Sequence, residues 1–301
     1  MNFFGRTAGA AKRSAAVIGV LSGAGAALFW AIGFVAARHG IDIGMTPAEL
    51  ALHRFVWPGL VLLPLVMRHG LSDLGGVGWG RAAQLTFFGG PPLAIISYAG
   101  FLIVPLGHGG LIQPSCAALG GLVLATLVVK EKLPAQRVVG AIAIVAGLVV
   151  IGGEALATIG THGLLGDLSF AFAGFFFATF GMLLRIWRIA PMRAAAVVSA
   201  VSLVLIPIHW LAFGFERIVA FGLMENLLQA LVQGALAGAG AIYLFARAVV
   251  LLGAGRAALF PSLVPPFTLL IGFLALGEIP SVLQLAGLAI VVAGFRLTQK
   301  G

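Results

Sequence analysis

The sequence has too little charge to cover the surface of a soluble protein of its length. Charged residues make up 9% of the 301 positions, whereas apolar residues make up 61%, and the mean hydropathy is +1.12. A soluble domain carries roughly 25% charged residues, because water must solvate its surface. The composition therefore excludes a soluble globular protein and predicts that lipid surrounds most of the surface.

Reactive side chains and nucleotide motifs are also scarce. The single cysteine, Cys116, lies in an apolar run, which excludes a disulfide framework and a cysteine metal cluster. No P-loop, dinucleotide fingerprint, Ser/His/Asp arrangement or metal-ligand spacing stands out. We therefore expect no enzymatic activity, no cofactor and no metal, and the missing nucleotide motif argues against an ATP-driven pump.

The surplus of positive charge does not indicate a nucleic-acid partner. The net charge is +9, but the basic residues are spread through short segments between apolar runs. We expect the lipid bilayer and a small-molecule substrate as partners. The sequence leaves the oligomeric state open, and a monomer is compatible with it.

Long apolar runs predict membrane-spanning helices. Runs such as 18–37 and 257–276 lack the alternation of barrel strands. A bilayer admits only helices or closed barrels, so an all-α fold is predicted. A span needs about 20 apolar residues. Ten candidates lie near residues 17–37, 47–67, 83–104, 107–128, 134–152, 165–185, 192–213, 225–246, 256–276 and 280–298.

The distribution of lysine and arginine predicts the orientation of these spans. If the N-terminus is cytoplasmic, fifteen of the eighteen basic residues fall in inside segments; only Arg38 and Arg217 fall outside, and Arg54 lies within the second span. This matches the positive-inside rule. The first apolar run follows Lys12 and Arg13 and is long enough to span, so we expect no cleaved signal peptide. We predict a multi-pass protein of the cell (inner) membrane with both termini cytoplasmic.

The chain partly matches itself at an offset of 147 residues. Shared positions include Pro114 with Pro261, Glu131 with Glu278, Gly140 with Gly287, and Gly147 with Gly294. Five spans per half invert the second half, as in many secondary transporters. We predict a cytoplasmic segment 1–16, a five-helix repeat 17–152, an external linker 153–164 and an inverted five-helix repeat 165–298. A duplication kept only for packing is the alternative.

Both halves resemble the EamA-type repeat of the drug/metabolite transporter superfamily, with the aromatic amino-acid exporters as the suggested subgroup. That repeat carries a proline in its fourth helix, an acidic residue at the following hairpin and glycines in its fifth helix. The family's Arg-aromatic pair is matched by Arg54-Phe55, although the second half has no equivalent arginine. The resemblance covers residues 18 to 297 and implies export or exchange of metabolites, with amino acids a common cargo.

Prolines inside the predicted spans are candidates for gating helix breaks. A proline leaves a helical carbonyl without its donor, which membrane helices tolerate only against protein or a water-filled cavity. The candidates are Pro114, Pro261 and Pro265. Simple kinks for packing are the alternative.

Polar and aromatic residues inside the spans are candidates for substrate binding. Arg54 must snorkel, face water or form a pair, for which Glu49 lies near the same end. A guanidinium facing the cavity would suit a carboxylate. Packing against lipid or bonding to the local backbone is the alternative for the other candidates. The set is Trp30, Arg54, Tyr98, Gln113, Ser115, Phe176, Thr179, Gln229, Gln233 and Ser262.

These features predict a secondary transporter that exports or exchanges small metabolites, with aromatic or other neutral amino acids as first choice, by alternating access around a central cavity. A multidrug or nucleotide-sugar transporter of the same architecture is the first alternative. A membrane channel or a membrane-embedded enzyme is the alternative from another class.

Overall fold

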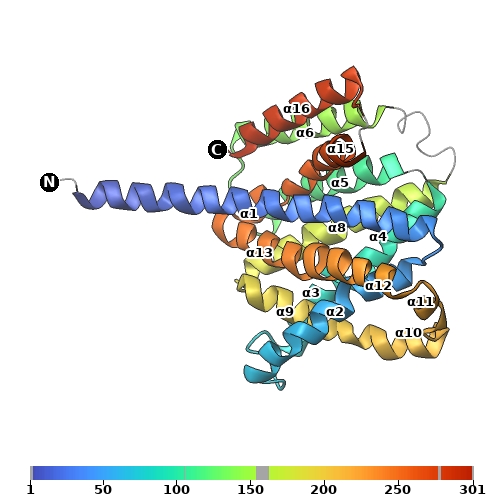
Figure 1. The fold of residues 1–301 in the computed structure, drawn as a ribbon. Helices are drawn as coiled ribbons and strands as arrows, with labels where there is room; N and C mark the ends of the chain where they lie inside the picture. The colour runs from blue at the N-terminus through green and yellow to red at the C-terminus, as the bar shows by residue number, and fades with distance from the viewer. Residues whose placement is uncertain (1–2, 105, 154–162, 277–278, 300–301) are drawn as a thin grey trace.

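The computed structural model describes residues 3–104, 106–153, 163–276 and 279–299, and throughout them every regular element is a helix (Figure 1). Within these residues, eight helical segments are long and apolar enough to cross a membrane. Two further apolar helices, α6 and α16, are shorter. The chain is thus a multi-pass helical membrane protein. A total of ten spans requires both shorter helices to cross as well, and it stays a prediction.

The helices divide between the two halves of the sequence. The first half contains α1 (Phe3–Asp42), α2 (Pro47–Arg68), α3 (Trp79–Gly89), α4 (Pro91–Ile103), α5 (Leu106–Leu127) and α6 (Ala135–Ile151). The second half contains α8 (Leu164–Ile186), α9 (Pro191–Val201), η1 (Ser202–Val204), α10 (Leu205–Phe213), α11 (Glu216–Ala220), α12 (Leu223–Gln229), the π-helix η2 (Ala230–Gly240), α13 (Ala241–Leu252), α14 (Ala254–Ala257), η3 (Phe260–Leu263), α15 (Val264–Leu276) and α16 (Val282–Gln299). The predicted repeat residue Glu278 and most of the predicted linker lie outside the described residues.

Several predicted spans are interrupted helices, and glycine or proline marks the interruptions. The third span is α3 followed by α4, with Gly90 between them and Pro91 opening α4. Proline suits a first turn, since that turn's N–H groups have no helical acceptor. The ninth span begins as α14 and the 3-10 turn η3, which contains Pro261, before α15 continues. These breaks place non-helical backbone inside the bundle rather than at its rim.

The start of α2 is fixed by its own sequence. The Glu49 amide donates to Thr46 Oγ1 at 3.2 Å, and the Thr46 amide donates to Glu49 Oε2 at 2.7 Å. This is a capping box, and Pro47 occupies the first turn. Glu49 also accepts from Arg217 at 3.0 Å. Glu49 therefore does not pair with Arg54, the partner considered from the sequence, because the cap and Arg217 already hold its carboxylate.

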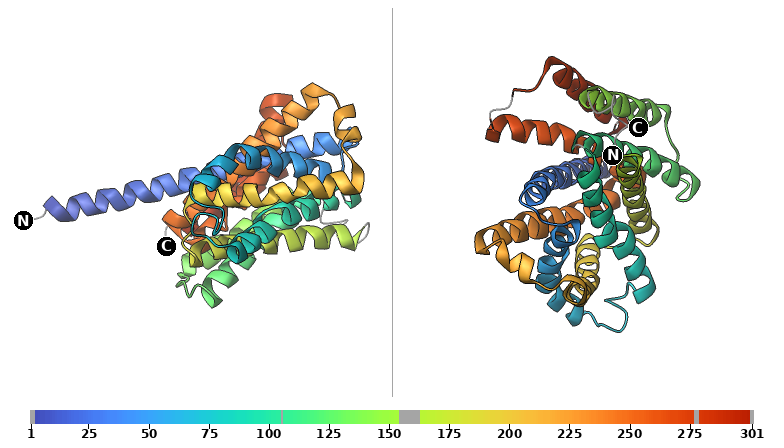
Figure 2. Two further views of the ribbon diagram at one scale, coloured as in Figure 1. Left: turned by 90° about the horizontal axis from the view of Figure 1, so that it is seen from below. Right: turned by 90° about the vertical axis from the view of Figure 1, so that its right-hand side faces the viewer.

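The two halves exchange equivalent contacts. Helix α1 packs against α13 and α15 of the second half, while α8, which has the same rank in its own half, packs against α4 and α5 of the first. The fifth apolar helices of the halves, α6 and α16, pack against each other and lie side by side at one margin of the bundle (Figures 1 and 2). Such an exchange is the pattern that two related repeats produce.

Glycines allow α6 and α16 to touch through their backbones. A Cβ built on Gly147 would lie 2.8 Å from the carbonyl oxygen of Gly287, and one on Gly140 would lie 2.7 Å from that of Gly294. The reverse pairs are equally close. Small residues at such positions let membrane helices approach closely. The glycines that recur at the 147-residue offset thus meet one another.

The outer surface is apolar, as lipid contact requires. Large side chains such as Val61, Leu211 and Leu274 are more than two-thirds exposed. A water-facing surface of this kind would aggregate, whereas lipid tails solvate it. Figure 1 shows the N-terminal part of α1 projecting beyond the other helices, so the predicted segment 1–16 is largely a continuation of that helix.

Candidate functional site

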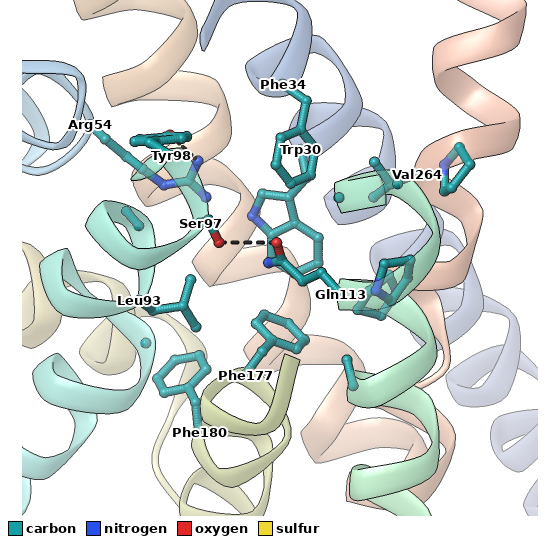
Figure 3. A pocket seen from close by; sticks show the side chains of 18 of the residues that line it. Trp30, Phe34, Arg54, Leu93, Ser97, Tyr98, Gln113, Phe177, Phe180 and Val264 are labelled. Atoms are coloured by element: carbon teal, nitrogen blue, oxygen red, sulfur yellow. Dashed lines mark hydrogen bonds between the residues drawn. The ribbon is translucent and has the colours of Figure 1, made fainter. Parts of the chain in front are cut away.

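A pocket lies at the centre of the bundle, between helices of both halves (Figure 3). We call it the central pocket. Its walls come from α1, α2, α3, α4 and α5 on one side and from α8, α13, η3 and α15 on the other. The residues that line it are Trp30, Phe34, Arg54, Gly89, Leu93, Ala94, Ser97, Tyr98, Gly109, Gly110, Gln113, Pro114, Ala117, Phe177, Phe180, Ile242, Pro261, Val264 and Pro265.

A chain of hydrogen bonds holds Arg54 in this pocket. Arg54 Nη1 donates to Tyr98 Oη at 2.9 Å, and Tyr98 Oη donates to Gln233 Oε1 at 2.9 Å. Gln233 Nε2 then donates to the carbonyl of Gly33 at 2.7 Å. The chain links α2, α4, η2 and α1, and Tyr98 and Gln233 are fully buried within it. Gln233 thus supports the pocket from behind and does not line it.

Close helix packing brings η2 to the right place for this chain. A Cβ on Gly238 would collide with the carbonyl oxygen of Arg54, and one on Gly234 would lie 2.9 Å from that of His53. These two glycines therefore let η2 lie directly on α2. Helix η2 carries the wider π-helical turn, and such turns are often found at functional sites.

The guanidinium of Arg54 carries a charge that no described residue neutralises. No carboxylate of the described residues lies within 4.0 Å of it. Its ring contact is with Phe55, at 5.9 Å from the centroid. Figure 3 shows the side chain reaching past Tyr98 toward the middle of the pocket. An ionisable residue inside a membrane protein in this situation is a candidate for a substrate or ion pathway.

Gln113 and Ser97 supply the other polar groups of the pocket. Ser97 Oγ donates to Gln113 Oε1 at 3.0 Å (Figure 3). Ser97 belongs to α4 and Gln113 to α5, so this bond joins two walls. The sequence singled out Gln113, and the structure places it in the lining.

Aromatic rings form the apolar part of the lining. Trp30 meets Phe177 edge to face at 4.9 Å between ring centroids, and both rings contact Phe245 behind them. The predicted aromatic, Phe176, instead packs between Phe87 and Phe88. Consecutive helical residues point about 100° apart, so only one of the adjacent pair can face the pocket. Phe177 faces it, and Phe176 does not.

All three predicted helix-break prolines line the pocket. Pro114 lies inside α5, and Pro261 and Pro265 lie in η3 and α15 opposite. Pro114 has no N–H, so the carbonyl of Gly110 lacks its usual helical donor. Gly110 also lines the pocket, and a Cβ there would meet nothing closer than 3.9 Å. The helix break therefore lies against open space.

Besides Gln233, four predicted polar residues are absent from the lining. Thr179 donates to the carbonyl of Phe175 at 2.9 Å, and Ser262 donates to that of Leu259 at 2.5 Å, as small hydroxyls in membrane helices often do. Gln229 donates to Ala36 and Glu225 near the α12 end of its helix. Ser115 is the fourth, and its hydroxyl has no partner in the structure. The helical period turns each of these side chains away from the pocket.

The lining also contains residues that the sequence did not single out. Phe34, Leu93, Phe180 and Ile242 are apolar residues in apolar spans. Nothing in their local sequence separates a pocket wall from a lipid contact. Ser97 carried a weak signal as a polar residue within a span.

The pocket continues toward one end of the molecule. A second pocket shares lining residues with the central one and extends to Ile151, at the C-terminal end of α6. The shared residues are Phe34, Gly110, Val264 and Pro265. The additional polar residues are Thr268 and Gln284.

A charged cluster joins the halves at the opposite end. Glu131 precedes α6, and its carboxylate lies 3.7 Å from both Arg137 and Arg185. It also accepts from the backbone N–H of Ala254 at 3.2 Å. Gly253 has φ +89°, and a Cβ there would lie 2.9 Å from Glu131 Oε1. The hairpin of the first half is thus tied to α8 and to the α13–α14 turn of the second.

No metal site is found among the described residues, since no group of three His, Cys, Asp or Glu side chains could hold an ion there. Of the described residues that line the central pocket, one is a cation, and none belongs to a phosphate-binding loop.

Comparison with known proteins identifies the family. The model of the EamA-like transporter family matches residues 17–153 and 164–298, which is nearly the whole chain and falls into the same two halves. No curated protein matches. A protein of known crystal structure aligns with a TM-score of 0.72 and 19% sequence identity, covering 95% of this chain and 96% of that one. That likeness shows the fold, and the two family matches show that this chain belongs to the EamA-like transporter family.

Proposed function

We propose that the protein is a secondary transporter that exports or exchanges small metabolites, neutral amino acids first among them, by alternating access around the central pocket. Membership of the family supports transport of small molecules across a membrane. The cargo and the mechanism are the parts that we add. The observation that carries them is a single arginine among aromatic walls at the meeting point of the two halves.

The lining fits a small carboxylate with an apolar body. Arg54 offers planar N–H donors that match a carboxylate. Trp30, Phe177 and Phe180 provide apolar and aromatic surface on the other side of the space (Figure 3). Aromatic amino acids have a carboxylate and an apolar body, so they are the first cargoes to test.

The arrangement of the halves supports alternating access. Equivalent helices exchange contacts across the pocket, as an inverted repeat with five spans per half would require. The pocket extends toward one end, while the Glu131 cluster joins the halves at the other. We therefore propose ten spans in the inner membrane, both termini cytoplasmic, with the Glu131 cluster on the cytoplasmic side.

The alternatives make different demands on the pocket. A nucleotide sugar carries phosphates that favour several cations, whereas one arginine lines this space. A multidrug exporter needs no carboxylate on its cargo and would tolerate loss of Arg54. A channel would conduct without saturation, and a membrane-embedded enzyme would turn its substrate over.

Counterflow into proteoliposomes tests the proposal. Vesicles preloaded with one amino acid at a time, including Phe, Trp, Met and Thr, should take up the labelled form saturably. Arg54→Ala and Gln233→Ala should abolish or strongly reduce this uptake, because one removes the carboxylate partner and the other the support of Tyr98. Arg68→Ala is the matched control, since Arg68 lies at the exposed end of the same helix. Absence of uptake for every amino acid by folded protein would remove amino acids as the cargo.

A further inference from the structure

The charge balance of the central pocket separates two kinds of cargo that an arginine could bind. Arg54 is the only charged side chain among the described residues that line the pocket, and none of them is a carboxylate. A bound zwitterion has no net charge, so the positive charge of Arg54 is not neutralised, and an ammonium group is placed in the pocket as well. The negative charge of a bound monoanion cancels the positive charge of Arg54, so the pocket and its cargo have no net charge.

The free hydrogen-bonding groups of the pocket are mainly donors. Arg54 uses Nη1 on Tyr98, and its other N–H groups have no partner among the described residues. Ser97 donates to Gln113 Oε1, which leaves the Nε2 amino group of Gln113 as a second donor. Neither side chain has a buried atom without a partner, so these N–H groups are not sealed inside the protein. A ligand rich in acceptor oxygens satisfies both.

The lining offers no carboxylate to an ammonium group among the described residues. Tyr98 Oη accepts from Arg54 and donates to Gln233, and the side chain is 1% exposed, so its remaining acceptor capacity is buried away from a ligand. The carbonyl of Gly110, deprived of its helical donor by Pro114, is a neutral acceptor. A neutral carbonyl does not offset a buried ammonium beside an unpaired guanidinium, because burying a charge is costly unless it is paired.

We propose that the central pocket selects organic monoanions, such as arylalkanoic and 2-oxo acids, over the zwitterionic amino acids of the same shape. The inference rests on the part of the proposed function that makes the central pocket the cargo site, and within that site it puts monoanions ahead of the neutral amino acids as the preferred cargo. Arg54 and Gln113 hold the carboxylate end, and the aromatic wall holds the apolar body. The α-amino group of an amino acid meets neutral acceptors and no carboxylate in the described part of the lining, which lowers its affinity.

Three ligands with one aromatic body test the selection. Binding of 3-phenylpropanoate, L-phenylalanine and phenethylamine to the purified full chain is measured by ligand-induced thermal shift and by calorimetry. We expect 3-phenylpropanoate to bind about tenfold or more tightly than L-phenylalanine, as an uncompensated buried charge costs at least that factor. Phenethylamine should not bind. Equal or tighter binding of L-phenylalanine, or any binding of phenethylamine, overturns the inference.

A charge introduced in the pocket should reverse the preference. Gln113→Glu supplies the carboxylate that an ammonium lacks and should shift the ratio of the two affinities about tenfold toward L-phenylalanine. Gln84→Glu makes the same chemical change on the exposed face of α3 and should leave the ratio unchanged. If the ratio of the two affinities is unchanged in folded Gln113→Glu protein, Gln113 does not lie beside the charged end of the ligand, and the assignment is contradicted. The wild-type series decides the question if that variant does not fold.

The outcome can be separated from that of the transporter proposal. Counterflow of L-phenylalanine without binding of 3-phenylpropanoate overturns the selection of monoanions and leaves the transporter in place. Binding of 3-phenylpropanoate that Arg54→Gln abolishes and Arg68→Gln preserves supports the selection. If no member of the series binds while another cargo shows counterflow, the inference fails and the transporter proposal stands.

Discussion

Arg54 is the residue on which the proposed binding of cargo depends. It is half-buried in a helix that crosses the bundle, and the groups around it are Tyr98, the Phe55 ring and the open space of the pocket. A long basic side chain in a membrane helix usually reaches the interface. Here its single hydrogen bond directs it inward. The charge therefore lies in a low-dielectric interior without an anionic partner among the described residues, and a bound carboxylate would offset that energetic cost.

Replacing Tyr98 by Phe should therefore weaken the site without removing the charge. The change leaves Arg54 without its acceptor and Gln233 Oε1 without its donor, and a buried polar group left unpaired costs about 1–3 kcal/mol. We expect a lower melting temperature and a several-fold higher apparent KM in counterflow. Tyr243→Phe is a close control, because Tyr243, the second tyrosine, is partly buried and does not line the central pocket. Equal behaviour of the two variants would show that the hydroxyl of Tyr98 does not position Arg54.

At the scale of elements, the contact between α6 and α16 depends on the absence of side chains. Four glycines face one another's carbonyl groups across this helix pair. Both helices are short for a membrane span, and they pack mainly against each other at the margin of the bundle (Figure 2). The pair therefore behaves as one unit, whose cohesion is backbone packing.

Gly147→Ala should separate this pair. The new methyl group would lie 2.8 Å from the carbonyl oxygen of Gly287, and backbone on both sides leaves little room to adjust. We expect a loss of stability of about 1–3 kcal/mol, the usual cost of overpacking, measured as a lower midpoint of thermal unfolding in detergent. Gly80→Ala provides the control, since Gly80 is helical and nothing lies within 4 Å of its Cβ position. Alanine there should be neutral or slightly stabilising. A Gly147→Ala protein as stable as the wild type would mean that the helices do not touch at this point.

At the scale of the whole molecule, the two ends of the bundle differ. The central pocket continues to the end where α6 finishes, and the Glu131 carboxylate ties the halves together at the end where α6 begins. Alternating access requires such a tie to break when the opposite end closes. Packed interfaces have discrete arrangements, so the halves are expected to move as bodies.

The proposed topology predicts which loops face outward. In a Cys116→Ala background, single cysteines at the exposed positions Leu164, Glu216 and Ser281 should react with a membrane-impermeant maleimide in intact spheroplasts. A cysteine at Lys132 should react only after permeabilisation. Lys132 and Leu164 flank α6, so the pattern tests whether α6 crosses, and Ser281 tests whether α16 begins on the outer side. Reaction at Lys132 in intact cells, or protection at Ser281, would contradict the ten-span arrangement.

Much of the molecule could be read from the sequence because its signals are local. Hydropathy over about 20 residues is a property of one segment, and it located the helices without any knowledge of their neighbours. The match of Pro114, Gly140 and Gly147 with the second half is also a property of the chain itself. The structure puts the three predicted prolines in the pocket lining and the repeated glycines in contact.

Which side of each helix faces the pocket was decided only by the tertiary structure. Lipid and protein interior are both apolar, so polarity does not tell a wall of the pocket from a lipid contact, and Phe177 could not be preferred to Phe176. The same reason explains why Gln229 and Thr179, polar and within spans, bond to backbone elsewhere. Glu49 lies five residues before Arg54, yet it pairs with Arg217, 168 residues away. The sequence determined which segments form apolar helices, whereas rotation about each helix axis, set by packing, determined which side chains line the central pocket.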